Sequence, residues 1–361
     1  MRPNPGGTAE KRVLSSLKQR FILPKSQTSL DKLQCLDTQL EGDNLGLDAS
    51  IYEQLQEKVS TIIHVGLSKM IGKFSNTNFV QAAWPVNFSL PLRAFEPSLK
   101  GLKNLLHLPM SSSQEPRFIF CSSTAAVLGP NHPSIILETI STSIDDPNSL
   151  GYSKSKWVAE SICSRVAESL NRKSTIKVVR IGQLTGDSNR GVWNMSEAYP
   201  LMLSTVKDIG GLPGINDKLS WLPLDVAAKT VCEISLAEES SHDCEGGACE
   251  VYHVVNNDTS ASFPDLLQWL GEVSDEPFEI MEPQKWLERL EKLENHPAKA
   301  LQGLWKRAYS DNTGDDSPQV TTFDTRNAEK VSETMRSVSA VDKILFEKIW
   351  KWCEGELGKK D

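Results

Sequence analysis

Apolar residues follow two spacings that alternate along most of the chain. Short apolar runs of the kind that form buried strands are separated by segments whose apolar positions recur at helical spacing. The strand-like runs are STIIHV (60–65), PRFIFCSS (116–123) and TIKVVRIG (175–182). Helical spacing occurs at 9–21 and 47–59, from about Ser89 to residue 108, and over 151–171. This alternation predicts an α/β fold with a Rossmann-like, doubly wound parallel sheet.

The carboxy-terminal part has a different pattern. After one more strand, EVYHVVNND, most of residues 263–357 has helical spacing, and residues 311–320 predict a polar loop. We expect residues 1–235 to form the Rossmann-like domain and residues 236–361 a smaller, mostly helical subdomain. Six of the nine tryptophans lie in or beside the helical part, where we expect core packing: Trp221, Trp269, Trp286, Trp305, Trp350 and Trp352. Near the amino terminus, KLQCLDTQL (32–40) is a short strand candidate.

Composition narrows the classes of partner. The 361 residues are 39% hydrophobic and 24% charged, enough to bury one large core with a smaller appended region. The net charge of −8 disfavours nucleic acid and anionic membranes as partners. The sequence contains no apolar run of about 18 residues, and its first residues lack the apolar core of a secretory signal. We therefore expect a cytoplasmic protein that binds neither nucleic acid nor membrane.

The cysteines give no clear metal site. Seven are scattered without a paired Cys-x-x-Cys spacing, a pattern typical of a reduced intracellular protein. Cys244 and Cys249 have His242 nearby and could hold a metal, but no second ligand pair follows at zinc-site spacing. A surface loop is the favoured interpretation, and we expect no metal.

Tyr152 and Lys156 form a Tyr-x-x-x-Lys pair at the start of a predicted helix, so both side chains lie on one helical face. Reduction of a carbonyl needs a proton donor for the developing alkoxide. A phenol can fill that role if a neighbouring ammonium lowers its pKa from about 10. The same ammonium can hold the ribose hydroxyls of a nicotinamide cofactor.

By itself this spacing is weak evidence, and a solvated helix face would also explain it. Its position in the chain is more informative. The pair follows 28 residues after Thr124, where a buried strand ends in the hydroxyl residues Ser122, Ser123 and Thr124. Such a hydroxyl can polarise the substrate carbonyl. The strand, loop and helix order is the arrangement of a short-chain dehydrogenase, which we favour over coincidence.

Longer stretches resemble a more specific family, the thioester reductase domains of nonribosomal peptide synthetases, polyketide synthases, α-aminoadipate reductase and adenylate-forming carboxylic acid reductases. The similarity extends over about residues 8–345. WPVNF, RIGQLTGD and GVWN are its most specific motifs, accompanied by GYSKSKWVAE, SWLPLDVAAK and TTFDTRNA.

The resemblance implies that NADP(H) is the cofactor and that the substrate is an acyl thioester on a phosphopantetheinylated carrier protein. Reduction would give an aldehyde or an alcohol in secondary metabolism. The resemblance assigns catalysis to Thr124, Tyr152 and Lys156. It assigns cofactor contacts to Arg2, Gln39, Ala83, Ser123, Gly182 and Gln183, with Gly182 and Gln183 beside the nicotinamide and Arg2 near an adenosine 2′-phosphate. Trp193 and Asn194 would line the substrate entrance.

The chain departs from this family at its amino-terminal end. The family begins with a strand and a glycine-rich turn that hold the pyrophosphate, and this sequence shows neither. Gln39 also stands where the family has an aspartate. We therefore expect an incomplete cofactor domain, an unpaired edge on the STIIHV strand, low stability and little NADPH affinity.

Residues 65–81 are a second departure, because the family passes directly from the IIH strand to AWPVNF. The ends of this segment are compatible with splice-site codons, so our hypothesis is a retained intron. A genuine surface loop is the alternative. Sequencing the transcript distinguishes them.

Three functions stay open at this point. The first is a thioester reductase, impaired in this chain. The second is a catalytically inactive reductase-like protein that binds a carrier protein, and the third is an extended short-chain dehydrogenase acting on a free small molecule. Among the remaining polar residues, we interpret His64 and His253 as packed core residues and Asp225 as a helix N-cap.

Overall fold

The computed structural model describes residues 8–23, 26, 30, 33–65, 84–112, 115–170, 176–237, 249–310 and 321–358. Two compact units divide the chain. Unit 1 consists of Met1–His132, Thr139–Arg180 and Glu238–Tyr252, and unit 2 of Pro133–Glu138, Ile181–Ala237 and His253–Asp361. The units interleave along the sequence, so neither coincides with residues 1–235 or 236–361.

The central sheet has four strands in the order β1 (Thr61–His64), β2 (Arg117–Ser123), β4 (Ile176–Ile181) and β8 (Glu250–Val254). β1 and β2 run parallel, with Thr61 opposite Arg117. The predicted α/β class with a Rossmann-like parallel sheet is confirmed. Among the described strands β1 is at the end of the sheet, as expected from the sequence.

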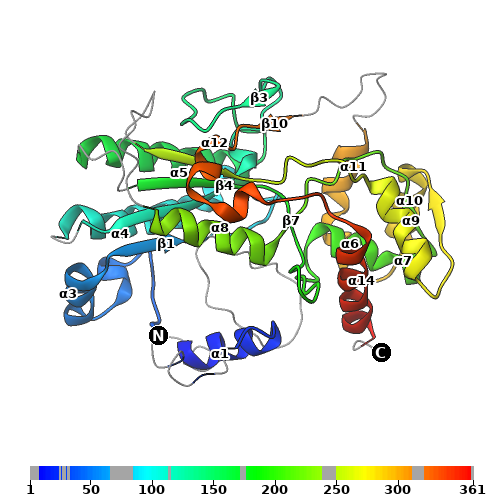
Figure 1. Cartoon of the computed structure of the whole chain (residues 1–361), viewed down its shortest axis with the longest axis horizontal. Coiled ribbons are helices and arrows are strands. Elements are labelled where there is room, and N and C mark those ends of the chain that lie inside the picture. The colour runs from blue at the N-terminus through cyan, green and yellow to red at the C-terminus, as the bar shows by residue number, and fades with distance from the viewer. Residues whose placement is uncertain are drawn as a thin grey trace. The chain divides into compact units, whose positions relative to one another are not determined.

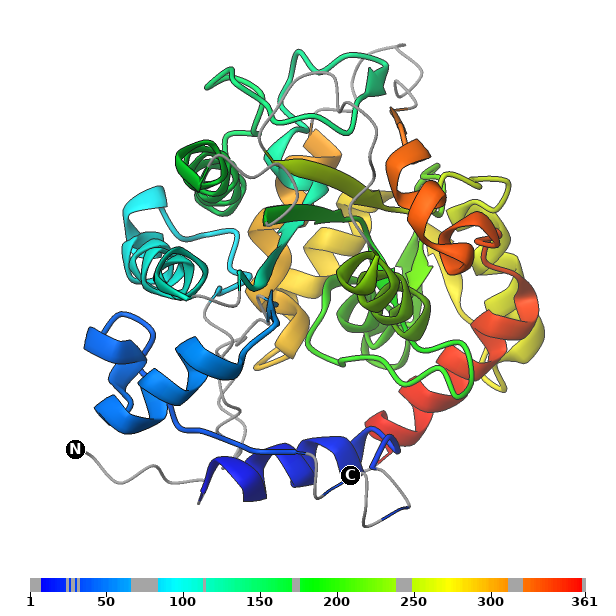
Figure 2. The same ribbon diagram turned by 60° about the vertical axis from the view of Figure 1, so that its left-hand side comes forward.

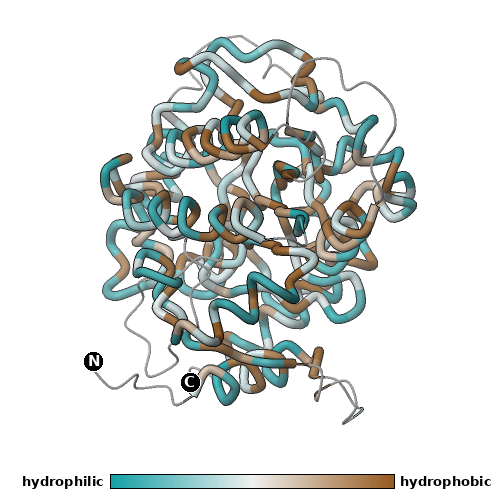
Figure 3. Tube along the Cα trace, turned by 90° about the vertical axis from the view of Figure 1, so that its left-hand side faces the viewer, coloured by the Kyte–Doolittle hydropathy of each residue, from teal (hydrophilic) through white to brown (hydrophobic). Residues whose placement is uncertain are grey.

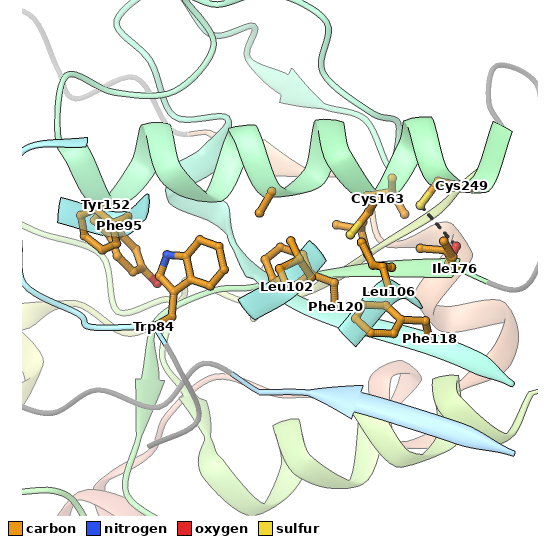
Figure 4. Packing of buried hydrophobic residues seen from close by; sticks show 14 residues of the cluster. Trp84, Phe95, Leu102, Leu106, Phe118, Phe120, Tyr152, Cys163, Ile176 and Cys249 are labelled. Carbon is orange, nitrogen blue, oxygen red and sulfur yellow. Dashed lines mark hydrogen bonds between the residues drawn. The ribbon is translucent and has the colours of Figure 1, made fainter. Parts of the chain in front are cut away.

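In unit 1, two long helices pack against the central sheet. The helical elements are α1 (Ala9–Gln19), η1 (Asp43–Gly46), α3 (Ala49–Lys58), η2 (Leu92–Phe95), α4 (Glu96–Ser111), η3 (Thr124–Ala126) and α5 (Gly151–Leu170). α4 and α5 lie side by side and both contact β2 (Figures 1 and 2). Their apolar side chains pack against those of β2 and β4 to form the core (Figure 4). The helical segment expected from about Ser89 begins at Leu92.

The expected strand at 32–40 is wrong. Residues 33–39 have no strand partner, and the chain then turns into η1. The reason lies in the backbone hydrogen bonds of Gln39, because its N–H donates to the Leu45 carbonyl at 2.8 Å and its carbonyl accepts from Gly42 N–H at 2.8 Å. Both groups are therefore used by a local turn, and neither is available to a sheet ladder.

Unit 2 is mostly helical, with α6 (Ala198–Leu203), α7 (Thr205–Ile209), α8 (Leu224–Leu236), α9 (Phe263–Val273), α10 (Pro283–Lys292), η4 (Pro297–Leu301), α11 (Gln302–Ser310), α12 (Arg326–Val331), α13 (Glu333–Arg336) and α14 (Lys343–Leu357). It also has three short parallel strand pairs, β3 (Ile135–Ile136) with β10 (Thr322–Phe323), β5 (Leu184–Thr185) with β7 (Leu222–Pro223), and β6 (Gly211–Pro213) with β9 (Glu279–Met281). These pairs were not predicted, because strands of two or three residues are too short to show an alternating pattern.

The predicted tryptophan core of the helical part is largely confirmed. Trp221, Trp286, Trp305 and Trp350 are buried, whereas Trp269 and Trp352 are half-buried. Hydrophobic and hydrophilic residues alternate around the helical turns, as amphipathic helices require (Figure 3). Within the described ranges, none of the helices combines the length and apolar character needed to span a bilayer.

Candidate functional site

The first turn of α5 positions Tyr152 beside the end of β2. Gly151 makes this possible, because a Cβ at this position would collide with the backbone of Leu90 and Leu92 just before and within η2. The Tyr152 ring is 8% exposed and packs edge to face against Phe88 at 5.6 Å between ring centroids. Phe95 is a second edge-to-face neighbour, at 6.3 Å (Figure 4). The phenol is thus held by aromatic packing on a rigid helix.

Ser123, the last residue of β2, forms a side-chain hydrogen bond with Tyr152. Burial raises the pKa of Tyr152 to about 12, and this hydrogen bond opposes the rise. Thr124 follows directly as the buried first residue of η3, and its carbonyl accepts from Val127 N–H. The end of β2 therefore brings Ser123 into contact with Tyr152, the candidate proton donor. The sequence had assigned Ser123 to the cofactor.

Lys156 lies one turn further along α5 and is 2% exposed. Its Nζ donates to the Cys121 carbonyl at 2.9 Å. The ammonium also lies over the rings of Trp84 and Phe120, at 4.6 and 4.8 Å from their centroids, and 6.0 Å from that of Tyr152. Burial lowers the pKa of Lys156 to about 8, opposed chiefly by Cys121 and then by Glu160 and Cys163. Cation–π contacts and one carbonyl compensate in part for the desolvation of the charge.

His64 closes the same cluster from the end of β1. Its ring stacks on Phe120 at 5.8 Å and meets Trp84 at 6.3 Å. Burial, and secondarily the charge of Lys156, lower the pKa of His64 to about 4, so the imidazole is neutral near pH 7. Its Nε2 has no hydrogen-bond partner among the described residues. The interpretation as a packed core residue is confirmed.

Trp84 was not singled out from the sequence as a site residue. Its Nε1 donates to Ser155 Oγ at 2.9 Å, and Ser155 Oγ donates to the Tyr152 carbonyl at 2.6 Å. The indole therefore fixes the first turn of α5, and the Lys156 ammonium lies over its ring. Figure 4 shows the Trp84 side chain near Tyr152 and Phe95. The available signal was the WPVNF motif, in which Trp84 is the first residue.

Four predicted site residues belong to unit 2. Gly182 N–H donates to the Val254 carbonyl at 3.0 Å, and the exposed Gln183 side chain donates to the Leu184 carbonyl at 2.7 Å. Trp193 is buried, with Nε1 donating to Glu197 Oε2 at 3.0 Å, and Asn194 is exposed.

The remaining predicted cofactor residues are Arg2, Gln39 and Ala83. Gln39 is exposed in its turn, while Arg2, Ala83 and residues 66–81 lie outside the described residues. His253 is buried with Nδ1 2.7 Å from the Asp324 carbonyl, which confirms a structural role.

Asp225 is not the N-cap of α8, because Pro223 occupies that position. Asp225 lies in the first turn instead, where its carboxylate accepts from the backbone and hydroxyl of Ser188, at 2.8 and 2.6 Å. The carboxylate remains near the positive end of the helix dipole while it holds the neighbouring loop.

In the described part of the chain, no group of three or more His, Cys, Asp or Glu residues could hold an ion. His242 and Cys244 lie outside that part. Cys249 is buried, with Sγ 3.2 Å from the Ile176 carbonyl (Figure 4), so it does not lie in a surface loop as expected.

Comparison with known sequences gives consistent matches. The model of an NAD-binding family described as Male sterility protein matches residues 1–72 and 74–231. The non-canonical non-ribosomal peptide synthetase ascB of Acremonium egyptiacum is 31% identical over 319 residues, covering 85% of this chain and 26% of that protein. The adenylate-forming reductase stbB of Stachybotrys bisbyi is 30% identical over 310 residues, covering 83% of this chain and 26% of that protein. The chain thus spans about a quarter of the length of these relatives.

Solved structures with the same fold include reductase domains of non-ribosomal peptide synthetase systems. The terminal R domain from the myxalamid PKS-NRPS biosynthetic pathway superposes with a TM-score of 0.77 at 19% identity, covering 96% of this chain and 81% of that domain. A reductase domain of a non-ribosomal peptide synthetase from Mycobacterium tuberculosis gives a TM-score of 0.74 at 17% identity, covering 99% and 84%. At these identities the likeness establishes the fold.

Proposed function

Because this chain belongs to the Male sterility protein family of NAD-binding domains, we propose that it is a nicotinamide-dependent reductase that acts on an acyl thioester. The thioester is carried on the phosphopantetheine arm of a carrier protein, and the product is an aldehyde or an alcohol. NADPH is the proposed cofactor. Support for the thioester comes from the similarity to the adenylate-forming reductase and the synthetases named above.

The observation that carries this proposal is the convergence of three groups at the end of β2. Ser123 hydrogen-bonds Tyr152, and Lys156 stands one turn away on the same helix. A nicotinamide ribose presents vicinal hydroxyls, and the phenol and ammonium supply donors that suit them. These residues therefore fit the nicotinamide ribose, because the Lys156 ammonium has two N–H donors besides the one that bonds the Cys121 carbonyl.

Bound NADPH would supply a hydride to the thioester carbonyl carbon. Tyr152 would donate its phenolic proton to the carbonyl oxygen, and Ser123 and Thr124 would hold that oxygen in place. The Lys156 ammonium would favour the phenolate that remains. Collapse of the resulting hemithioacetal breaks the carbon–sulfur bond and releases the aldehyde and the protonated thiol, so one hydride and one proton are consumed for each aldehyde formed.

A second function is favoured by one specific observation. Lys156 Nζ is enclosed by Trp84 and Phe120 and bonded to a main-chain carbonyl, and burial raises the pKa of Tyr152 to about 12. A site fixed in this arrangement would not transfer protons efficiently near pH 7. The alternative is therefore a reductase-like protein that binds a carrier protein without turnover. Reduction of a free small molecule is a third possibility, which the same experiment tests.

The purified chain is incubated with acyl-pantetheine thioesters, the corresponding free aldehydes and NADPH or NADH. Nicotinamide oxidation is followed by absorbance, and products are identified by mass spectrometry. The proposal predicts thioester-dependent oxidation, faster with NADPH, with release of one thiol for each aldehyde. NADPH oxidation with the aldehydes but not with the thioesters would identify a dehydrogenase of free small molecules. No oxidation, combined with retained binding of a loaded carrier protein, would establish the non-catalytic alternative.

A further inference from the structure

In unit 1, a buried charged network lies between β2, β4 and α5, next to the candidate proton-transfer groups. Glu160 on α5 and Arg180 on β4 are 1% and 0% exposed. Arg180 Nε is 3.1 Å from each carboxylate oxygen of Glu160, and its Nη2 is 2.7 Å from Oε2. Ser122 Oγ donates to Glu160 Oε1 at 2.6 Å, and Arg180 Nη2 also donates to the Thr139 carbonyl at 2.9 Å. The network ties β2, β4 and α5 together at one point.

Its position relative to the candidate site is specific. Ser122 immediately precedes Ser123, the residue that hydrogen-bonds Tyr152. Glu160 lies one helical turn beyond Lys156, on the same face of α5. We propose that the Ser122–Glu160–Arg180 network is a positioning device for proton transfer, which fixes the end of β2 against α5 and keeps the Lys156 amine charged through the Glu160 carboxylate. The proposal rests on the reductase function proposed above and assigns residues to it.

Stability alone does not require such a network. Removing two charges from water costs several kcal/mol for each ion, and a well-packed hydrophobic replacement of a buried pair is often neutral or stabilising. The Glu160 carboxylate does, however, act on the charge of Lys156. Lys156 is buried with its pKa lowered to about 8, and Glu160 is one of the groups that oppose this lowering. An ammonium needed for catalysis near neutral pH would depend on that opposition.

Several titratable or charged groups lie around Lys156, and any test must account for each of them. β1 contributes His64 and β2 contributes Cys121. α5 contributes Tyr152, Glu160 and Cys163. Arg180 on β4 is ion-paired with Glu160. His64 is neutral near pH 7, and burial raises the pKa of Cys121 to about 11 and that of Cys163 well above its ordinary value. Glu160 is the carboxyl group in this set.

The test measures the titration of Lys156 in the whole chain by NMR, with the protein labelled at lysine side-chain nitrogen and the signal assigned by its loss in Lys156→Arg. Glu160→Gln keeps the volume and removes the negative charge. We expect the pKa of Lys156 to fall by about one unit. The matched control is Glu168→Gln, the same change on the exposed face of α5, for which we expect no shift.

Glu160→Gln leaves Arg180 buried without its carboxylate and could prevent folding. Glu160→Gln combined with Arg180→Met leaves no unpaired charge, so it keeps the fold testable. Glu160 is the member of this pair with a clear effect on the pKa of Lys156, and loss of the Arg180 charge works against it, so the Lys156 pKa should still fall, but by less than in Glu160→Gln. An unchanged Lys156 titration in the double variant would overturn the proposal.

This titration needs neither substrate nor cofactor, so it is independent of the reductase function. A shifted Lys156 titration in a protein without turnover would disprove the proposed reaction and leave the electrostatic coupling intact. In an active protein, the upper pH limit of turnover should move down with the Lys156 pKa. A merely structural role of Glu160 would lower the folded fraction and leave that limit in place.

Discussion

Burial of Lys156 is costly, because the ammonium loses solvation and gains one carbonyl and two aromatic faces. Its pKa is about 8 in the folded protein, against 10.5 for an unperturbed lysine. Between these values the folded protein binds fewer protons than the unfolded chain, so this residue makes stability rise as pH increases. Below about pH 8 the full cost of the buried charge is present.

Replacing Lys156 by Met should therefore stabilise the protein at pH 7, by roughly 2 kcal/mol after allowance for the unpaired Cys121 carbonyl. The gain should shrink as pH rises through 8 towards 10.5, since the wild-type amine is then neutral when folded. Urea denaturation at several pH values measures the difference. Lys154→Met, an exposed change on the same helix, is the control. A gain that does not vary with pH would contradict the assigned charge state.

Tyr152→Phe removes the proposed proton donor and keeps the aromatic packing on Phe88 and Phe95. We expect turnover to fall by about 100-fold or more, since general acid catalysis contributes this much. NADPH affinity should fall far less than turnover, because the ring, the helix and the Lys156 ammonium that suits the ribose hydroxyls stay in place. Steady-state kinetics and fluorescence titration separate the two effects. Tyr52→Phe, on α3, is the folding control, and normal turnover in Tyr152→Phe would refute the assignment.

At the residue scale, sequence spacing located Tyr152 and Lys156 because helical periodicity fixes which side chains share a face. The partner of Tyr152 could not be predicted in the same way. Ser122 and Ser123 end β2 and Thr124 begins η3, and which of these hydroxyls lies near Tyr152 depends on where the strand stops. The aromatic contacts of Lys156 with Trp84 and Phe120 join residues far apart in sequence, which no spacing reveals.

At the scale of elements, the loop before α6 is held against α14 in unit 2. Lys348 Nζ donates to the Ser188 carbonyl and Trp352 Nε1 to the Trp193 carbonyl, at 2.8 and 2.9 Å. Gly191 allows the loop to approach the backbone of α14 directly, with a left-handed φ of +70°. The GVWN motif is therefore explained in part by packing, which leaves substrate lining by Trp193 and Asn194 as a proposal.

Gly191→Ala should destabilise the protein by about 3 kcal/mol, since the new Cβ meets the backbone of Lys348 and Ile349 and alanine disfavours this φ. Gly355→Ala is the matched change within α14, where open space surrounds the new Cβ. It should stabilise by about 0.5 to 1 kcal/mol. Thermal and urea denaturation compare the two. Equal effects would show that α14 does not lie against the loop.

The elements themselves were predicted unevenly. Long periodic segments such as α5 and α9 were found, because many positions repeat the same signal. The strand expected at 32–40 was wrong because an apolar run forms a strand only when a neighbouring strand accepts its backbone hydrogen bonds. Gln39 uses those bonds in a turn, which an apolar run does not reveal.

For the whole molecule, the order of the sheet has a consequence for association. β1 is the end strand among the described strands, and Ile63 on it is 41% exposed. An exposed apolar end strand is a template for pairing with another chain. The fold class and the family were predictable from distributed motifs, whereas the interleaving of the two units was not, since it depends on long-range contacts.

Ile63→Lys should reduce self-association, because a lysine on an edge strand opposes pairing. Ile344→Lys is the matched control, an exposed isoleucine on α14 that gains the same charge. Light scattering at matched concentrations measures the onset of association. Equal suppression by both changes would attribute the effect to net charge and not to the strand edge.

The central claim is that the Tyr152 site reduces a thioester with a hydride from NADPH. The most direct measurement is label transfer from NADPH deuterated at nicotinamide carbon 4, each diastereomer tested separately with an acyl-pantetheine thioester. We predict that one diastereomer places deuterium on the aldehyde carbon of the product and that Tyr152→Phe suppresses this transfer. An aldehyde without label from either diastereomer, or the absence of any reduced product, would contradict the claim.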